Sequence, residues 1–399
     1  MKILLLHSTF WPLIGGTESI MRQHAEMLAE HGHDVRVVTG HGQPSNDQYH
    51  VEVLKELSPG FPLNLQAKRA LDHGQTDQHL NTFTHLLTET LKPYYDQADV
   101  VITHGAVTTH FNLALTQAVW KLAGSKPTIA WVHDFTPANK NYALPNPGHM
   151  PWALMSQAHP QIKYVAVSGQ RQQEITQTLG LEESQVPVIE NGIDFNELLG
   201  IEPAFKSWLE RIDFLARDII FFYPTKLLQR KNIDQAILWA DAIKKAGLNP
   251  LLLISGSQDV YGTAGASYED YLKYFPKQLG LENEVFYLND YNDEIGPVWQ
   301  QAFRISDVLL FSSGYEGFGI PPLEAVATRI PCWCQPLGTI PDWLAPAMTF
   351  VKTPEEAAGA AQELVSNPVF QARKRIWQEH NWNYLYDKKI WPLLQSLLG

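Results

Sequence analysis

The chain has 399 residues, 45% of them hydrophobic and 18% charged, which is typical of a globular protein with more than one core. Its formal net charge of −12 and its lack of a basic stripe argue against nucleic acid as a partner. No run reaches the roughly 18 apolar residues that span a bilayer, so we expect no integral membrane segment. The run Lys2–His7 predicts a first strand rather than a leader, and we expect a cytoplasmic protein.

Apolar runs alternate with helical segments in the first half of the chain. They predict buried strands at Lys2–His7, Asp34–Thr39, Asp99–His104, Thr128–His133 and Lys163–Ser168. Apolar residues at helical spacing predict a helix over Ser19–Glu30. Residues 41–80 are polar and rich in histidine, and we expect a long surface excursion there.

A second series predicts strands at Ile219–Tyr223, Pro250–Ser255, Glu284–Leu288, Asp307–Phe311 and Ile330–Cys334. Strands alternating with helices imply an α/β fold with parallel sheets and right-handed crossovers. We therefore expect Rossmann-like domains at 1–192 and 193–375, followed by an aromatic-rich helix at 376–399 that packs back on the first domain. Cys332 and Cys334 alternate along a strand and predict packing rather than a disulfide or a zinc site.

Two glycines, Gly15 and Gly16, follow the first strand and precede Thr17 and Glu18 at the start of a helix. Glycine lets the backbone approach an anion, and a helix N-terminus adds partial positive charge. The motif is not G-x-G-x-x-G, and no acidic residue ends the second strand, which argues against a nicotinamide dinucleotide. A tight turn with Thr17 as the N-cap is the alternative.

Polar residues also follow two other predicted strands. Lys226, Arg230 and Lys231 suit a diphosphate at the carboxyl end of a strand, and a solvated basic turn is the alternative. His133 and Asp134 end the strand that begins at Thr128. His133 either donates to a sugar hydroxyl or relays a proton, or it is structural.

The stretch SSGYEGFGIPPLEAVA, residues 312–327, lies between an apolar strand and a helix, with Glu316 and Glu324 eight positions apart. Carboxylates at the carboxyl end of a parallel sheet are well placed to accept hydrogen bonds from sugar hydroxyls. The alternative is a Gly/Pro loop with one solvated glutamate and one in the first helical turn.

Together these segments resemble the retaining nucleotide-sugar glycosyltransferases of family GT4, which have the two-domain GT-B fold. Glu316 to Glu324 is similar to the E-x7-E element of that family, and residues 2–19, KILLLHSTFWPLIGGTES, resemble its N-terminus. ENGID at 190–194 and GTIPDW at 338–343 resemble its domain junction and a later loop. The resemblance covers nearly the whole chain and implies two sheets that face each other across a deep interdomain cleft.

The resemblance also implies roles for matching residues. Lys226 and Lys231 would hold the donor diphosphate, Glu324 would bind the ribose, and His133 and Glu316 would lie near the transferred sugar. His133, Glu316, Lys226 and Lys231 would thus carry catalysis. The remaining donor contacts would come from Gly15, Gly16, Gly256, Gly317, Phe318, Gly319 and Ile320, and the acceptor side from Trp11, His104, Asp134 and Phe135.

The implied reaction moves a hexose from a nucleoside diphosphate sugar to a saccharide or small alcohol with retention of configuration. UDP-glucose-type donors are favoured over GDP-mannose-type donors, with the base read near Gly256–Val260 and Tyr287–Tyr291. The family needs no metal and no cofactor, and this sequence has no D-x-D motif. Lys226 stands where the family usually has Arg, so a compact ammonium charge replaces a planar guanidinium that can form two parallel hydrogen bonds. Glu190 replaces a common Pro, and Tyr223 is also unusual.

Two other interpretations stay open. The protein could be a non-catalytic sugar-nucleotide-binding subunit of a glycosyltransferase complex, although the intact glutamates and lysines argue against this. It could also be an epimerase or phosphorylase of the same fold. A phosphorylase would need pyridoxal phosphate on a lysine, and the sequence shows no matching lysine context.

Overall fold

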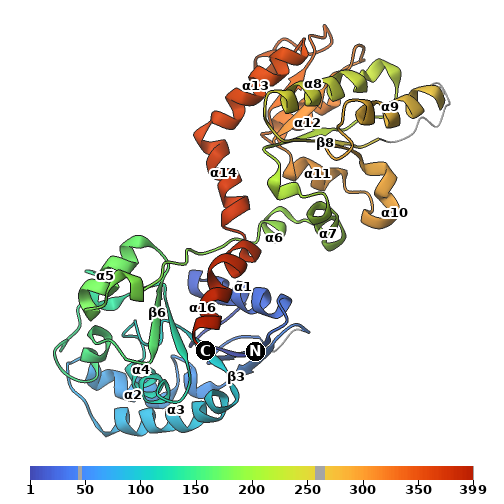
Figure 1. Cartoon of the computed structure of the whole chain (residues 1–399). Coiled ribbons are helices and arrows are strands. Elements are labelled where there is room, and N and C mark those ends of the chain that lie inside the picture. The colour runs from blue at the N-terminus through green and yellow to red at the C-terminus, as the bar shows by residue number, and fades with distance from the viewer. Residues whose placement is uncertain (44–46, 257–265, 399) are drawn as a thin grey trace. The chain divides into compact units, whose positions relative to one another are not determined.

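The computed structural model describes residues 1–43, 47–256 and 266–398, and it divides the chain into two compact units (Figure 1). Unit 1 comprises Met1–Ile193 and His380–Gly399, and unit 2 comprises Asp194–Glu379. The chain therefore leaves unit 1 after Ile193 and returns to it at His380, where the sequence predicted bounds of 192 and 376.

Unit 1 contains a six-stranded sheet of order β3-β2-β1-β4-β5-β6 in which all neighbours are parallel. All five strands predicted for this part form within two residues of their expected bounds. Helices cover both faces of the sheet, which is why its central strands are unbroken apolar runs. The strands are β1 Lys2–Leu6, β2 Asp34–Thr39, β3 His50–Val53, β4 Val100–His104, β5 Thr128–Val132 and β6 Ile162–Ala166.

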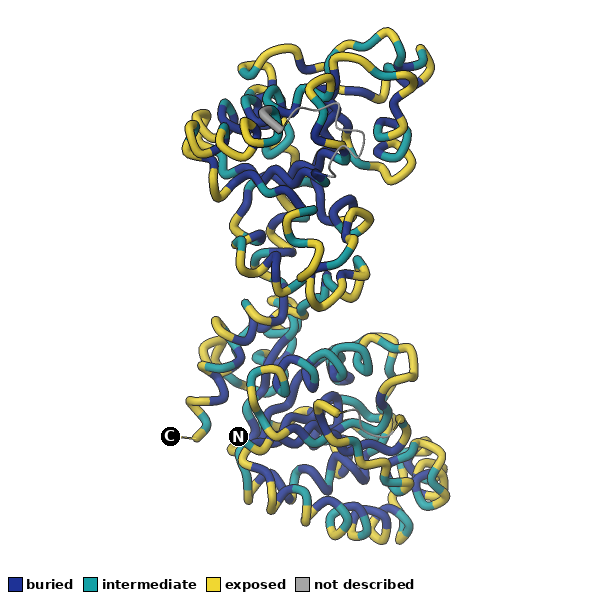
Figure 2. The backbone as a smooth tube through the Cα atoms, turned by 90° about the vertical axis from the view of Figure 1, so that its right-hand side faces the viewer, coloured by how far each residue is buried: buried dark blue, intermediate teal, exposed yellow. Residues whose placement is uncertain are grey.

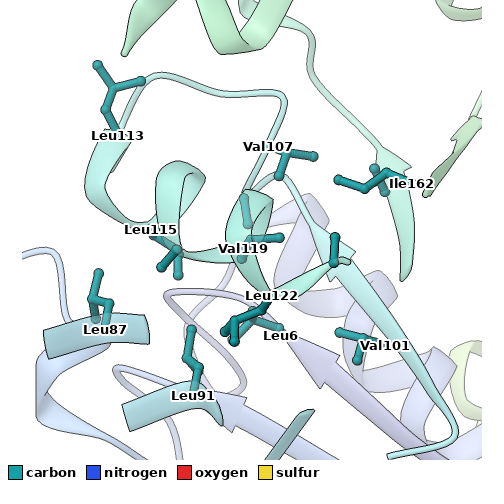
Figure 3. Close-up of a cluster of buried hydrophobic side chains, with 14 of the residues drawn as sticks. Leu6, Leu87, Leu91, Val101, Val107, Leu113, Leu115, Val119, Leu122 and Ile162 are labelled. Carbon is teal, nitrogen blue, oxygen red and sulfur yellow. The ribbon is translucent and has the colours of Figure 1, made fainter. Parts of the chain in front are cut away.

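The helices of unit 1 that follow these strands are α1 Gly16–Glu30, α2 Pro62–Leu71, α3 Gln78–Gln97, α4 Leu113–Leu122 and α5 Gly169–Leu179. Leucines of α3 and α4, such as Leu91 and Leu115, pack with Leu6 and Val101 of the sheet in one buried cluster (Figure 3). The opposite face of the sheet is covered by α1 and by the C-terminal segment.

The surface excursion expected over 41–80 is wrong in part. The described residues of this stretch add the edge strand β3 to the sheet and form α2, which buries Asn64, Ala67 and Leu71. Three of the four residues of this edge strand are exposed, so its sequence needs no apolar run. Because residues 41–80 are mostly polar, the sequence pattern did not predict β3.

Unit 2 contains a second parallel sheet of six strands, in the order β12-β11-β10-β7-β8-β9. The five predicted strands form, and Cys332 and Cys334 are buried free thiols, as expected. The short edge strand β12 was not predicted, because only its first residue is buried. The strands are β7 Ile219–Tyr223, β8 Pro250–Ile254, β9 Val285–Tyr287, β10 Val308–Phe311, β11 Cys332–Cys334 and β12 Met348–Phe350.

Helices also cover both faces of the second sheet, whose strands are the most buried part of unit 2 (Figure 2). They are α6 Phe195–Leu199, α7 Pro203–Arg211, α8 Ile233–Lys245, α9 Ala266–Gln278, α10 Asn292–Ile295, α11 Trp299–Ile305, α12 Ile320–Ala327, α13 Pro354–Ser366 and α14 Pro368–Glu379. Within the described residues, no helix combines the length and apolar character that crossing a membrane requires.

The C-terminal segment belongs to unit 1. Helix α15 (Trp382–Leu385), a turn of π-helix and helix α16 (Trp391–Ser396) follow α14. The indole N–H of Trp382 donates to Gln23 of α1 at 2.7 Å, and the backbone N–H of Ile193 donates to the carbonyl of His380 at 2.8 Å. A Cβ at Gly192 would lie 2.7 Å from the Trp382 ring, so the NGID stretch is shaped by packing.

Candidate active site

Each sheet has one switch point, where the strand order reverses and two loops diverge at the carboxyl edge. In unit 2 it lies between β7 and β10, which pair in parallel with Val308 opposite Phe221. The loop after β7 carries the predicted cations, and the loop after β10 carries the predicted glutamate. The pairing of the two strands therefore brings together side chains that lie 85 positions apart in the sequence.

The centre of this arrangement is an ion pair in which the Lys231 ammonium donates to Oε1 of Glu316. The guanidinium of Arg230 lies 3.4 Å from the other oxygen of Glu316 and donates to the carbonyl of Tyr315 at 3.2 Å. Desolvation acts to raise the pKa of Glu316, but hydrogen bonds from Lys231 and Ser313 and the two positive charges outweigh it. The pKa of Glu316 is therefore lowered, and the group is a carboxylate at neutral pH.

Lys226 completes the predicted set of cations but takes no part in the ion pair. Its side chain is exposed and has no partner among the residues that the structure describes. Of the two lysines matched to the donor diphosphate, Lys231 is thus held in place and Lys226 is free to reach an anion.

A buried tyrosine connects the two loops of the switch point. The hydroxyl of Tyr223 donates to the backbone carbonyl of Lys231 at 2.6 Å and lies 3.1 Å from Oγ of Ser313. Ser312 donates to the carbonyl of Asn232 at 2.8 Å. Burial, the main cause, raises the pKa of Tyr223 to about 12, so its hydroxyl keeps its proton. The backbone around the cations is therefore tied to the loop that carries Glu316.

Beyond Glu316 the loop exposes unpaired backbone donors. The N–H groups of Gly317, Phe318, Gly319 and Ile320 have no hydrogen-bond partner in the described part of the chain. Gly319 adopts φ 90°, and a Cβ there would approach the Phe311 ring at 3.3 Å. Backbone N–H groups at the start of α12 that lack a partner among the described residues suit phosphate or sugar oxygens.

Glu324 lies on α12 and is half-buried. Its carboxylate has no hydrogen-bond or ionic partner within the residues that are described. Its role as a ribose ligand stays a prediction.

The switch point of unit 1 lies between β1 and β4, and histidines surround it. Nδ1 of His104, the last residue of β4, lies 2.9 Å from Nε2 of His133, which follows β5. His7, which follows β1, donates from Nδ1 to the backbone carbonyl of His104. His24 of α1 lies against this group, with its ring centroid 5.3 Å from that of His104.

Burial keeps these histidines neutral. Desolvation, with smaller contributions from neighbouring rings, lowers the pKa of His24 to about 3 and that of His133 to about 4. It also lowers the pKa of His7, and it places the pKa of His104 well below the usual value. At neutral pH the group offers imidazole donors and acceptors rather than positive charge.

The predicted Gly-Gly turn begins α1, with Gly15 as the N-cap and no side-chain cap, so the alternative interpretation with Thr17 as the N-cap is wrong. A Cβ at Gly15 would lie 2.1 Å from the carboxylate of Glu18, which accepts a hydrogen bond from Thr9 at 2.7 Å. Gly16 has nothing within 4 Å of a Cβ position. The backbone of Gly16 is therefore open to approach from outside.

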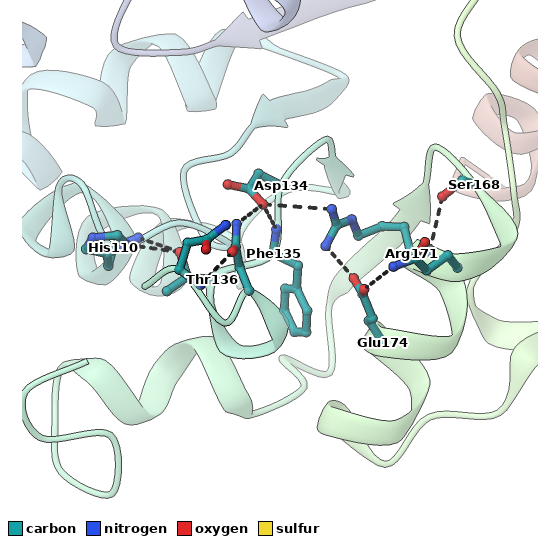
Figure 4. Close-up of polar contacts among 10 residues, drawn as sticks. His110, Asp134, Phe135, Thr136, Ser168, Arg171 and Glu174 are labelled. Atoms are coloured by element: carbon teal, nitrogen blue, oxygen red, sulfur yellow. Dashed lines mark hydrogen bonds and ion pairs between the residues drawn. The ribbon is translucent and has the colours of Figure 1, made fainter. Parts of the chain in front are cut away.

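Asp134 is held by backbone and side-chain donors (Figure 4). Its Oδ1 accepts from the N–H of Phe135 at 2.9 Å and from Asn139 at 3.3 Å, and it lies 3.8 Å from Arg171. Arg171 also pairs with Glu174. Asp134 is thus part of a fixed network at the end of β5.

The other predicted acceptor-side residues differ in exposure. Trp11 is 40% exposed and lies under the guanidinium of Arg22 at 5.0 Å. His104 is 0% and Phe135 1% exposed, so neither side chain can touch an acceptor in this structure. Gly256 follows β8 at φ 71° and donates to the carbonyl of Thr225 at 3.1 Å.

Residues 257–260 of the proposed base-reading segment lie outside the described residues, and Tyr287–Tyr291 spans the end of β9 and a 3-10 turn. Four residues around the switch point of unit 1 were not among the predicted site residues: His7, His24, Glu18 and Arg171. Only His7 carried a usable signal, because it ends a strand as His133 does. The others are brought to the site by helix packing and by side-chain contacts.

Comparison with known proteins gives both halves of the chain a family. Residues 14–197 match the model described as Glycosyltransferase Family 4, and residues 206–380 match Glycosyl transferases group 1. A glycosyltransferase of Methanocaldococcus jannaschii is 24% identical, with all of both chains covered. An Escherichia coli protein, UDP-Gal:alpha-D-GlcNAc-diphosphoundecaprenol alpha-1,3-galactosyltransferase, is 23% identical over 83% of this chain and 79% of its own. Mannosylglucosylglycerate synthase of Petrotoga mobilis is 23% identical over 58% of each chain.

Among solved structures, Anabaena HepE in complex with UDP and glucose is 18% identical with full coverage of both chains and a TM-score of 0.39. WaaG, a glycosyltransferase of lipopolysaccharide biosynthesis, is 15% identical over 99% of this chain and 98% of its own, with a TM-score of 0.32. The two family matches and the two doubly wound sheets lead to one conclusion. The chain is a glycosyltransferase of the group 1 family, with an N-terminal domain of the Family 4 type.

Proposed function

We propose that the protein transfers a hexose from a nucleoside diphosphate sugar to an acceptor hydroxyl with retention of the anomeric configuration. The observation that carries the proposal is the switch point of unit 2, where a cationic loop meets a glutamate loop in which four N–H groups have no partner among the described residues. This arrangement suits a ligand with a diphosphate at one end and hydroxyls at the other.

Lys226 and Lys231 would bind the diphosphate and neutralise the charge that develops as it leaves. Glu324 would accept hydrogen bonds from the ribose, and Glu316 would face the hexose. The acceptor oxygen forms a bond to the anomeric carbon as the bond to the diphosphate breaks. In this front-face scheme a phosphate oxygen takes the proton of the acceptor, and no side chain serves as nucleophile. Neither a metal nor a cofactor is needed for these steps.

A UDP-hexose is the favoured donor, with a GDP-hexose as the alternative. The name of the E. coli relative specifies a UDP-Gal donor, which supports a uridine nucleotide. The acceptor would be a saccharide or a small alcohol that approaches unit 1 near Trp11 and Asp134. The buried free thiols of Cys332 and Cys334 are compatible with a reducing cytoplasm.

The test is donor turnover by purified protein with UDP-glucose, UDP-galactose and GDP-mannose, followed as release of the nucleoside diphosphate. Lys231→Ala should lower the rate about 10²–10³-fold, because it removes a cation that stabilises the leaving group. Lys245→Ala is the matched control, since Lys245 is an exposed lysine of α8 whose partner among the described residues is Asp241 of the same helix. The H1–H2 coupling of the product sugar reports whether configuration is retained.

Near wild-type turnover by Lys231→Ala would overturn the site assignment. Nucleotide binding by calorimetry without any turnover would instead favour a non-catalytic binding subunit.

A further inference from the structure

His104 contacts two other histidines through two different groups. Its backbone carbonyl faces Nδ1 of His7, and its ring Nδ1 faces Nε2 of His133 at 2.9 Å. A carbonyl can only accept, so His7 must carry its hydrogen on Nδ1. Because His7 is neutral, its Nε2 is left as an acceptor.

His104 and His133 are both neutral, so one ring nitrogen of this contact donates the hydrogen bond and the other accepts it. The distance alone does not say which ring is the donor. If His133 donated, His104 would carry its own hydrogen on Nε2. Nε2 of His104 is buried and has no partner among the described residues. The indole N–H of Trp131, whose ring stacks near His104, is also buried and unpaired there. Two buried donors would then lack an acceptor, which native structures avoid. The opposite direction leaves a lone pair on Nε2 of His104 and no additional unpaired N–H.

We propose that His104 is a positioning residue that donates from Nδ1 to Nε2 of His133 and so fixes the hydrogen of His133 on Nδ1. The same residue fixes His7 through its carbonyl. One buried histidine thereby determines which ring atom of each neighbour is a donor and which is an acceptor.

The two remaining ring atoms are available to a ligand. Nδ1 of His133 and Nε2 of His7 have no partner in the described part of the chain, and neither is among its buried unpaired atoms. His133 then presents an N–H donor and His7 an acceptor, just after β5 and β1, the two strands that lie on either side of β4. This pair fits a sugar hydroxyl, which donates one hydrogen bond and accepts others. The use of the pair on a sugar rests on the proposed function, whereas the tautomers themselves do not.

The direct test is the tautomer of His133, measured at neutral pH by long-range 1H–15N correlation in protein with 15N-labelled histidine rings. Signals are assigned by single substitutions of His7, His104 and His133. We expect all three rings in the Nδ1–H form, which is the minor neutral tautomer of histidine in water. A His133 ring in the Nε2–H form would overturn the proposal, whether or not the protein transfers sugar.

Variants of His104 add a second readout. His104→Asn places an amide donor near the position of Nδ1 and should keep His133 in the Nδ1–H form. His104→Leu has no donor and should release it toward Nε2–H, with a loss of about 3- to 10-fold in kcat/KM for the donor sugar. Binding of UDP alone should not change in either variant, because the lysines and the glutamate predicted to bind the nucleotide lie in unit 2 and His104 is not a predicted donor contact.

His24→Asn is the matched control, since His24 lies in the same cluster without a hydrogen bond to His133. It should leave the tautomer of His133 unchanged. Equal losses in His104→Asn and His104→Leu, or a tautomer change in His24→Asn, would show that packing alone is at work and would overturn the positioning role.

Discussion

Lys231 and Glu316 form an ion pair between the two loops of one switch point, and their side chains are only 14% and 12% exposed. Glu316 therefore neutralises part of the positive charge that a diphosphate would meet. In the proposed reaction its carboxylate would have opposite effects on two steps, because it would compete with the diphosphate for Lys231 and would face the sugar during transfer.

Glu316→Gln should consequently separate binding from turnover. We expect UDP to bind as tightly as to the wild type or up to about 5-fold more tightly, since the Glu316 carboxylate no longer competes with the diphosphate for Lys231 and Arg230. The 5-fold limit corresponds to about 1 kcal/mol, the upper end for an ion pair near the surface. Hexose transfer should fall by about 10²-fold or more, because a charge that faces the transition state is removed. Calorimetry with UDP and a turnover assay on the same preparation measure both. Weaker UDP binding together with normal turnover would contradict the competition.

Gly16→Ala tests whether a ligand approaches the backbone at the start of α1. No atom lies within 4 Å of the new Cβ, so the stability of unit 1 should be unchanged or higher by about 0.4–1 kcal/mol. A phosphate that contacts this backbone would meet the methyl group, and kcat/KM for the donor should fall by about 10²-fold. Thermal unfolding and steady-state kinetics distinguish the two effects. Full activity would show that nothing binds closely at Gly16.

Tyr223→Phe removes the hydroxyl that ties the cationic loop to the glutamate loop. The Lys231 carbonyl and Ser313 each lose a buried partner, so we expect a loss of about 1–3 kcal/mol in the free energy of unfolding and weaker nucleotide binding. Tyr95→Phe is the control, because the buried hydroxyl of Tyr95 has no partner among the described residues. It should be neutral or stabilising. Equal destabilisation by both changes would show that the Tyr223 hydroxyl does not connect the loops.

The buried histidines predict an acid-sensitive unit 1. Burial lowers the pKa of His24 to about 3 and of His133 to about 4, from 6.5 in the unfolded chain. Between pH 6.5 and about 4 the unfolded chain binds more protons, so the free energy of unfolding falls as the pH drops. Each histidine adds a slope of up to about 1.4 kcal/mol per pH unit.

Urea unfolding at pH 7.5, 6.0 and 5.0, read by hydrogen exchange of unit 1 peptides, measures this slope. His24→Asn should reduce this slope by up to about 1.4 kcal/mol per pH unit, the contribution of one histidine. A slope that is the same in the variant would mean that His24 is not buried as a neutral ring in the native protein.

The sequence alone predicted ten of the strands, including the edge strands β6 and β9, because each is rich in apolar residues and largely buried. It missed β3 and β12, which are edge strands with mostly exposed side chains. It also placed Lys226, Lys231 and Glu316 in loops that follow strands and Glu324 at the start of the next helix, and hence at the ligand edge of a sheet, from local order alone.

What the tertiary structure decided is which of these residues meet. Lys231 pairs with Glu316 because β7 and β10 are neighbours, a relationship between strands that no local pattern encodes. Burial, too, is a property of the assembled unit. His104 was expected to contact the acceptor, but its side chain is fully buried. The packing of distant segments also forms the hydrogen bonds of His7 and Tyr223. Local sequence determined the elements and their ends, whereas pairing and desolvation, which depend on distant segments, decided the chemistry of the site.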